Sequence, residues 1–159
     1  RMILAQNVHC DPEDVVISTG PRGKPFLPAA RNSADIKFNL SHTGELMLLG
    51  VTRKRELGVD IELVKKTSHM DEIIDRFASV EIQNEMRMLP EPERETAFFT
   101  WWTRMESYLK CIGTGISGLP TIDDPCVSFV MDEYHYRGNV YLYAVCVLTD
   151  DSADGRWSP

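Results

Sequence analysis

The stretch LGVDIELV, residues 57–64, places two carboxylates, Asp60 and Glu62, in a short apolar segment. Side chains alternate between the two faces of a strand, so both carboxylates point to one face and the apolar residues beside them point to the other. Their Cα atoms lie ~6.5 Å apart at about 3.3 Å per residue, which is close enough for both side chains to bind one cation. The same alternation is typical of an edge strand that faces water, so the pattern leaves a cation site and a solvated strand both open.

Composition restricts the class of protein. The 159 residues, 43% of them hydrophobic, are enough for one compact domain and too few for two ordinary ones. The formal charge of −7 argues against a general nucleic-acid binder. No apolar run approaches the roughly 20 residues of a membrane helix, and we expect a cytoplasmic protein without a membrane partner. The cysteines lack metal-binding spacing, so we expect free, buried thiols at Cys10, Cys111, Cys126 and Cys146.

Strand patterns precede helical patterns along the chain and then return. Short apolar runs predict strands at residues 15–17, 36–40, 46–52, 57–63, 127–131 and 140–148. Apolar spacings of three and four residues predict helices at residues 70–77, 79–89 and 93–112, the last ending at Gly113. We expect residues 46–52 and 57–63 to form a hairpin through the basic turn between them. The whole pattern predicts an α+β fold, with a small, mainly antiparallel sheet and helices packed on one face.

The long helix adds a third carboxylate. Trp102, Glu106 and Lys110 are spaced four residues apart and form a row beside the apolar stripe. One interpretation is that Glu106 and Lys110 form an exposed ion pair, worth about 0.2–0.5 kcal/mol. Alternatively, Glu106 joins Asp60 and Glu62 around a magnesium ion, because this cation prefers oxygen ligands.

Two further segments carry groups that can contact a phosphate. In FNLSHTG, residues 38–44, Ser41 and His42 offer a hydroxyl and an imidazole, although such residues often only satisfy a turn. In GPRGKP, residues 20–25, Lys24 can reach a phosphate or remain an ordinary solvated lysine. Neither segment is specific by itself.

The order of the segments is more informative than any one of them. G-K-P, F-N-L-S-H, G-V-D-I-E, W-x-x-x-E-S-x-x-K and G-x-G follow one another between residues 20 and 148. This order resembles the 4'-phosphopantetheinyl transferases, in particular the second lobe of the two-lobed, surfactin-synthetase-activating type. The resemblance implies a magnesium-dependent enzyme that transfers the 4'-phosphopantetheine arm of coenzyme A to a serine of an apo acyl or peptidyl carrier protein.

The resemblance assigns metal and catalytic roles to four residues. Asp60, Glu62 and Glu106 would bind Mg²⁺, or Mn²⁺, on the pyrophosphate of coenzyme A. Lys110 would hold pyrophosphate charge, and Glu106 would accept the proton of the carrier's serine hydroxyl. Phosphoryl transfer of this kind depends mainly on positioning and charge neutralisation.

The resemblance also assigns contacts with the two substrates. Ser41, His42 and Lys110 would bind the phosphates of coenzyme A, and Lys24 would lie near its nucleotide end. The carrier would contact basic residues or an apolar surface, and the candidates are residues 53–55, residues 65–66, and the region of Met70, Ile74 and residues 86–89.

The chain departs from the family pattern in two respects. A lysine usually precedes the metal-binding glutamate, whereas here Met105 precedes Glu106 on the apolar stripe, so we expect weakened activity. The family type also has two lobes. We therefore expect residues 1–19 to be the remnant of a preceding lobe or linker with the first strand, residues 20–149 the transferase lobe, and residues 150–159 a polar tail. A missing first lobe or a second copy of the chain would complete the cleft.

Two other classes of function stay open. Met105 also suits a catalytically impaired member that acts as a carrier-protein or coenzyme A binding module, although three retained carboxylates that repel one another count against it. An unrelated magnesium-dependent phosphohydrolase would explain the carboxylates but not the G-K-P and S-H segments. Stabilisation by metal and coenzyme A together distinguishes an enzyme from a docking module.

Overall fold

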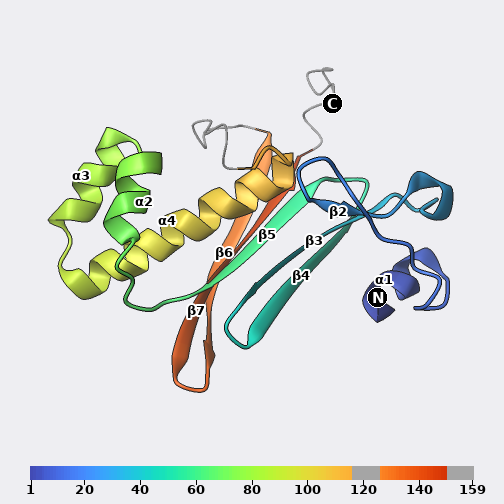
Figure 1. Ribbon diagram of the computed structural model, residues 1–159, viewed down its shortest axis with the longest axis horizontal. Coiled ribbons are helices and arrows are strands. Elements are labelled where there is room, and N and C mark those ends of the chain that lie inside the picture. The colour runs from blue at the N-terminus through green and yellow to red at the C-terminus, as the bar shows by residue number, and fades with distance from the viewer. Residues whose placement is uncertain (116–125, 150–159) are drawn as a thin grey trace.

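The computed structural model describes residues 1–115 and 126–149 (Figure 1). The first part of the chain contains α1 (Met2–Val8), β1 (Ser18–Thr19), β2 (Pro25–Phe26), the 3₁₀ turn η1 (Ala29–Arg31), β3 (Ile36–Thr43), β4 (Leu46–Arg53) and β5 (Leu57–Leu63). The second part contains α2 (Met70–Phe77), α3 (Val80–Met88), α4 (Glu91–Ile112), β6 (Val127–Tyr136) and β7 (Asn139–Leu148). The α+β prediction is confirmed, except that the short strand expected at residues 15–17 lies just beyond them, in β1.

Strand pairing differs from the sequence prediction. Strand β4 pairs with β3, so the expected hairpin between residues 46–52 and 57–63 is wrong. The pair Thr43 and Leu46 encloses a two-residue turn in which Gly44 has φ 54°, a conformation that tight hairpins favour. Strand β5 instead pairs antiparallel with β7, in a sheet of order β5-β7-β6. An apolar run therefore predicts that a segment forms a strand. It does not predict which strand pairs with that segment, because the hydrophobicity is compatible with either neighbouring strand.

Helix α4 lies across the sheet formed by β5, β7 and β6, with α2 and α3 near its N-terminal half (Figure 1). It ends at Gly113, whose φ of 69° is the left-handed conformation expected of a helix stop. The helix also approaches β5 closely at Gly58. A Cβ at this position would lie 2.0 Å from the carbonyl oxygen of Ser107 and 2.2 Å from the amide nitrogen of Cys111. Glycine is therefore required for this contact between strand and helix.

The core has one part under α1 and further parts around α4. Leu4 and Ala5 of α1 pack with Ile36 and Phe38 of β3. The apolar spacing of α4 predicts a stripe of Phe98, Trp101 or Trp102, Met105, Leu109 and Ile112. Both tryptophans are partly buried and the other four are buried. The stripe packs against the sheet and against α2 and α3, which fixes the orientation of α4 about its own axis.

None of the four cysteines, all of which lie in the described residues, forms a disulfide, in agreement with the sequence prediction, but only two of them are buried. Cys111 and Cys146 are buried, Cys126 is partly covered, and Cys10 is exposed. Among the helices of the described residues, none is long and apolar enough to cross a membrane.

Candidate active site

Asp60 lies at the centre of the site and is only 2% exposed. It shares one face of β5 with Gly58 and Glu62, and Gly58 places that face directly against α4. Its Oδ1 accepts hydrogen bonds from the Ser41 hydroxyl at 2.8 Å and from the Lys110 ammonium at 2.5 Å. Its Oδ2 is buried and has no hydrogen-bond partner among the residues described. A buried carboxylate oxygen is normally paired, so this atom is a candidate ligand position.

Lys110 links the carboxylates of the strand and the helix. Its Nζ lies 2.5 Å from Asp60 Oδ1, 3.2 Å from Ser41 Oγ and 4.0 Å from Glu106 Oε2. The Lys110 and Glu106 side chains are 30% and 17% exposed, so the interpretation of an exposed ion pair is wrong. The tertiary fold turns this helical row toward β5, where a charge interacts more strongly than it does in water.

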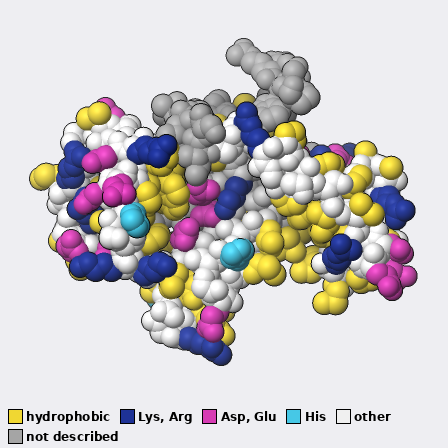
Figure 2. All heavy atoms as spheres, viewed as in Figure 1, with side chains coloured by type: hydrophobic (Ala, Val, Ile, Leu, Met, Phe, Trp, Pro, Cys, Tyr) yellow, Lys and Arg dark blue, Asp and Glu magenta, His cyan; other side chains and the backbone are white. Residues whose placement is uncertain are grey.

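Glu62 and Glu106 complete the acidic group, which we call the carboxylate cluster together with Asp60. Burial, followed by the charge of Asp60, raises the pKa of Glu62, while Thr43 opposes the rise by donating a hydrogen bond of 3.4 Å. Burial also raises the pKa of Glu106, and the nearby Lys110 opposes that rise. Acidic side chains gather beside a basic one near the middle of the face in Figure 2. The cluster is therefore under-neutralised, with one ammonium among three carboxylates.

The carboxylate cluster is a candidate metal site. Within residues 1–115 and 126–149, no group of three or more His, Cys, Asp or Glu side chains is arranged to hold a metal ion as it stands. The chemistry of the group nevertheless fits a hard divalent cation, since all three side chains offer oxygen ligands. The Oδ2 of Asp60 lacks a partner among the described residues, and burial raises the pKa values of Glu62 and Glu106, with the Asp60 charge adding to both rises. A cation bound among these oxygens would offset both effects.

Lys24 lies beyond the cluster, at the C-terminal end of α4. Its Nζ is 2.7 Å from Glu56 Oε2 and donates to the carbonyl of Cys111 at 2.9 Å. Arg22 of the same loop donates to the carbonyl of Thr114 at 2.8 Å. These contacts satisfy carbonyls at the end of the helix and place two basic side chains of the loop there. The loop is thus tied to α4, rather than being an isolated solvated turn.

His42 and Met105 follow or precede Ser41 and Glu106 in the sequence, but neither of them belongs to the carboxylate cluster. Strand alternation directs His42 to the face of β3 opposite Ser41, and its side chain is exposed. Met105 is 2% exposed and packs among apolar residues, as its place on the stripe predicted. Arg104 is exposed, with its guanidinium 4.8 Å from the ring centre of Phe129, so it does not replace the missing lysine.

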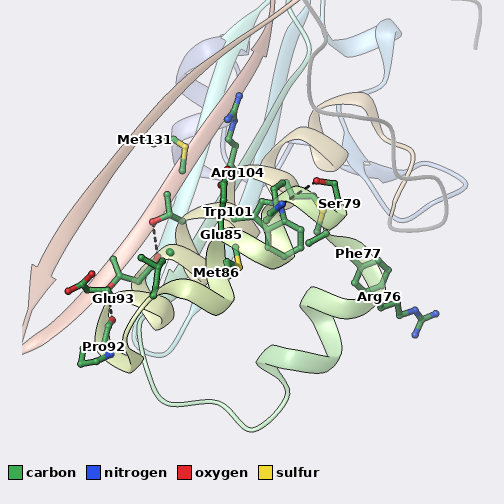
Figure 3. Close-up of a pocket in the computed structure, with 17 residues that line it drawn as sticks. Arg76, Phe77, Ser79, Glu85, Met86, Pro92, Glu93, Trp101, Arg104 and Met131 are labelled. Atoms are coloured by element: carbon green, nitrogen blue, oxygen red, sulfur yellow. Dashed lines mark hydrogen bonds between the residues drawn. The ribbon is translucent and has the colours of Figure 1, made fainter.

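A groove lies on another side of α4. This groove of about 1210 Å³ lies between α2, α3, α4 and β6, and Figure 3 shows Trp101 and Arg104 of α4 on its wall. Met105 also lines it. Its lining among the described residues includes none of the three clustered carboxylates. The groove is therefore mainly apolar, with charged residues such as Glu85 and Arg104 in its lining, and it is separate from the carboxylate cluster.

Comparison with known proteins agrees with the motif order. Residues 56–138, more than half of the chain, match the sequence profile of the 4'-phosphopantetheinyl transferase superfamily, and the chain therefore belongs to this family. It is 34% identical over 123 residues to the 4'-phosphopantetheinyl transferase HetI of Nostoc sp., a match that covers 77% of this chain and 52% of that protein.

Other relatives support the same family. The 4'-phosphopantetheinyl transferase Sfp of Bacillus subtilis is 30% identical over 117 residues, which cover 74% of this chain and 50% of the relative. A phosphopantetheinyl transferase of Thraustochytrium sp. is 30% identical over an alignment 168 residues long, gaps included. The match covers 95% of this chain and 58% of the relative. The chain spans about half the length of the first two of these curated relatives.

Sequence reasoning missed three residues that shape the site. Thr43 lies two positions after Ser41 on the same face of β3, and strand periodicity alone could have associated it with Glu62. Gly58, two positions before Asp60, could have been read as a close backbone contact, because a glycine inside a strand often marks one. The contact of Glu56 with Lys24 joins segments 32 positions apart, and no local pattern predicts it.

Proposed function

We propose that this chain is the catalytic lobe, residues 20–149, of a transferase that moves the 4'-phosphopantetheine arm of coenzyme A to a serine of an apo acyl or peptidyl carrier protein. The observation that carries the proposal is the meeting of Asp60, Glu62, Glu106 and Lys110 between β5 and α4. These residues come from the segment that matches the transferase family. We further propose a cytoplasmic location, which four described cysteines without a disulfide favour.

The carboxylate cluster would hold one divalent cation, Mg²⁺ or Mn²⁺, through Asp60, Glu62 and Glu106. Such a cation neutralises charge on the pyrophosphate of coenzyme A and stabilises the departing nucleotide. Lys110 adds a further positive charge on the same side of the cleft. Ser41 orients Asp60 through its hydrogen bond, so its proposed contact with coenzyme A phosphate must coexist with that role. Lys24 and His42 remain candidates for contacts with the phosphates and the nucleotide.

In the proposed reaction, the serine hydroxyl of the carrier attacks the phosphorus that bears the pantetheine arm. The bond from that phosphorus to the bridging oxygen breaks, and adenosine 3',5'-bisphosphate leaves. Glu106 accepts the serine proton, directly or through a water molecule. Burial raises the pKa of Glu106, which makes its carboxylate a better proton acceptor near neutral pH.

The carrier is proposed to bind through basic side chains next to β5. Residues 53–55 and 65–66 are exposed and suit an acidic partner. The apolar alternative at Met70, Ile74 and residues 86–89 keeps only part of its surface, because Met70, Ile74 and Met86 are buried whereas Met88 is 86% exposed. Their spacing predicted one face of each helix, but it could not distinguish a core face from a docking face. We also propose that a further lobe, or a second copy of this chain, completes the binding site for coenzyme A.

The test is mass spectrometry of an apo carrier protein incubated with this protein, coenzyme A and Mg²⁺. The expected result is a mass gain equal to one phosphopantetheine arm, which disappears in the Asp60→Asn variant. Thermal denaturation with metal and coenzyme A together reports binding even when transfer is slow. Stabilisation without a mass gain would favour the binding-module alternative, which Met105 in place of the usual lysine suggests. No stabilisation and no gain would contradict the proposal.

A further inference from the structure

The chain supplies its own cation to the carboxylate cluster. The Lys110 ammonium lies 2.5 Å from Asp60 and 4.0 Å from Glu106, and the Ser41 hydroxyl accepts from it at 3.2 Å. The charge of Lys110 also opposes the rise in pKa of Glu62, so it acts on all three carboxylates.

We propose that Lys110 is a tethered counter-ion that competes with a divalent cation for Asp60, and that metal binding releases its ammonium to the pyrophosphate of the substrate. This inference rests on the proposed function, because it concerns the same carboxylate cluster. It adds that the Lys110 ammonium weakens metal binding when coenzyme A is absent.

Lys110 and a metal ion bound to Asp60 would compete for the charge of one carboxylate. The Nζ of Lys110 contacts Asp60 Oδ1 directly. A metal ion on the same carboxylate would lie within a few ångströms of this ammonium. Two positive charges at that separation repel strongly where water is largely excluded, and Asp60 is buried. This repulsion favours a displaced ammonium once a metal ion binds Asp60 Oδ2, which has no hydrogen-bond partner in the described part of the chain.

Lys110 is the partner that can move. Its side chain is 30% exposed, and a lysine has a flexible four-carbon stem with rotatable donors. Asp60, in contrast, is fixed on β5 and is held by the hydroxyl of Ser41. An ammonium displaced from Asp60 needs a new anionic partner, and the pyrophosphate of coenzyme A is one. Metal and coenzyme A should then bind cooperatively, each strengthening the other by the same factor.

The test is isothermal titration calorimetry with Mn²⁺, first without coenzyme A. Lys110→Met, which removes the charge but keeps the length, should bind Mn²⁺ at least ~10-fold more tightly than the unaltered chain, within the usual range of coupling. Lys110→Arg keeps the charge and should bind weakly, like the unaltered chain. Lys37→Met is the matched control, because Lys37 pairs with Asp35 and Glu56, and its loss changes the net charge equally.

The second part repeats the titration with coenzyme A present. The unaltered chain should then bind Mn²⁺ more tightly, whereas Lys110→Met should gain little. Equal or weaker Mn²⁺ binding by Lys110→Met without coenzyme A, in a variant that thermal denaturation shows to be folded, would overturn the inference but not the proposed function. Lys110→Gln provides the same comparison if Lys110→Met does not fold. Absence of Mn²⁺ binding in every variant, with or without coenzyme A, would overturn both.

Discussion

Replacing Gly58 with alanine is expected to push α4 away from β5. The new Cβ would lie 2.0 Å from the Ser107 carbonyl oxygen and 2.2 Å from the Cys111 amide nitrogen, whereas real Cβ contacts essentially never fall below 3.0 Å. Both atoms belong to the backbone of α4, so no side-chain rotation relieves the clash. The helix must therefore shift by at least about 1 Å in a closely packed interior.

The energetic cost can be estimated from the size of this shift. Overpacking a core costs about 1–3 kcal/mol, and moving a whole helix places Gly58→Ala at the upper end. In a domain of this size, each kcal/mol lowers Tm by roughly 2–4 °C, so the expected decrease is about 6–12 °C. Because α4 carries Glu106 and Lys110, the variant should also bind Mn²⁺ and coenzyme A more weakly.

Gly50→Ala provides the matched control for this experiment. A Cβ at Gly50 would lie 2.6 Å from Leu57 Cδ1 and Val59 Cγ1, which are side-chain atoms that can rotate away. Its Tm should fall by less than half as much as that of Gly58→Ala, when both are measured by circular dichroism. If Gly58→Ala matched this control, or kept its Tm within 2 °C of the unaltered chain by the same scale of roughly 2–4 °C per kcal/mol, the close helix contact would be refuted.

Three further changes test the site and its surroundings. Burial, then Asp60, raises the pKa of Glu62, so the metal-free protein loses stability as pH rises above 4.5. Glu62→Gln should therefore raise Tm at pH 7 but not near pH 4; an equal gain at both would contradict this. Met105→Lys buries an ammonium and should lower Tm by about 4–8 °C, whereas Met105→Leu should be nearly neutral; equal values would show that position 105 is open to water. Lys24→Met loses hydrogen bonds to Glu56 and to the end of α4, and should cost about 1–2 kcal/mol in urea unfolding, unless water replaces both contacts.

Periodicity in the sequence was sufficient to predict most of the helices and their buried faces. Met105 and Leu109 lie at four-residue spacing, and the structure buries both, because a helix must cover its apolar stripe. The left-handed glycine at 113 was predictable for a local reason, since few other residues adopt positive φ at a helix end. The ordered motifs also indicated the family correctly.

Pairing of the strands could not be predicted in the same way. Strand β4 has a turn at each end, and local hydrophobicity does not decide which neighbouring strand it joins. The position of Lys110 beside Asp60 could not be predicted either, because i,i+4 spacing with Glu106 is the same in an exposed pair and in a site.

The sequence by itself therefore determined which side chains share a strand face or a helix face, because alternation and helical spacing are local properties. Only the tertiary structure decided that the acidic face of β5 meets the Glu106–Lys110 row of α4, with the hydroxyl of Ser41 beside them. That meeting depends on Gly58, whose missing side chain lets the backbones of strand and helix touch. Contacts between distant segments arise from packing of the whole chain, and for this reason the charge balance of the site became visible only in three dimensions.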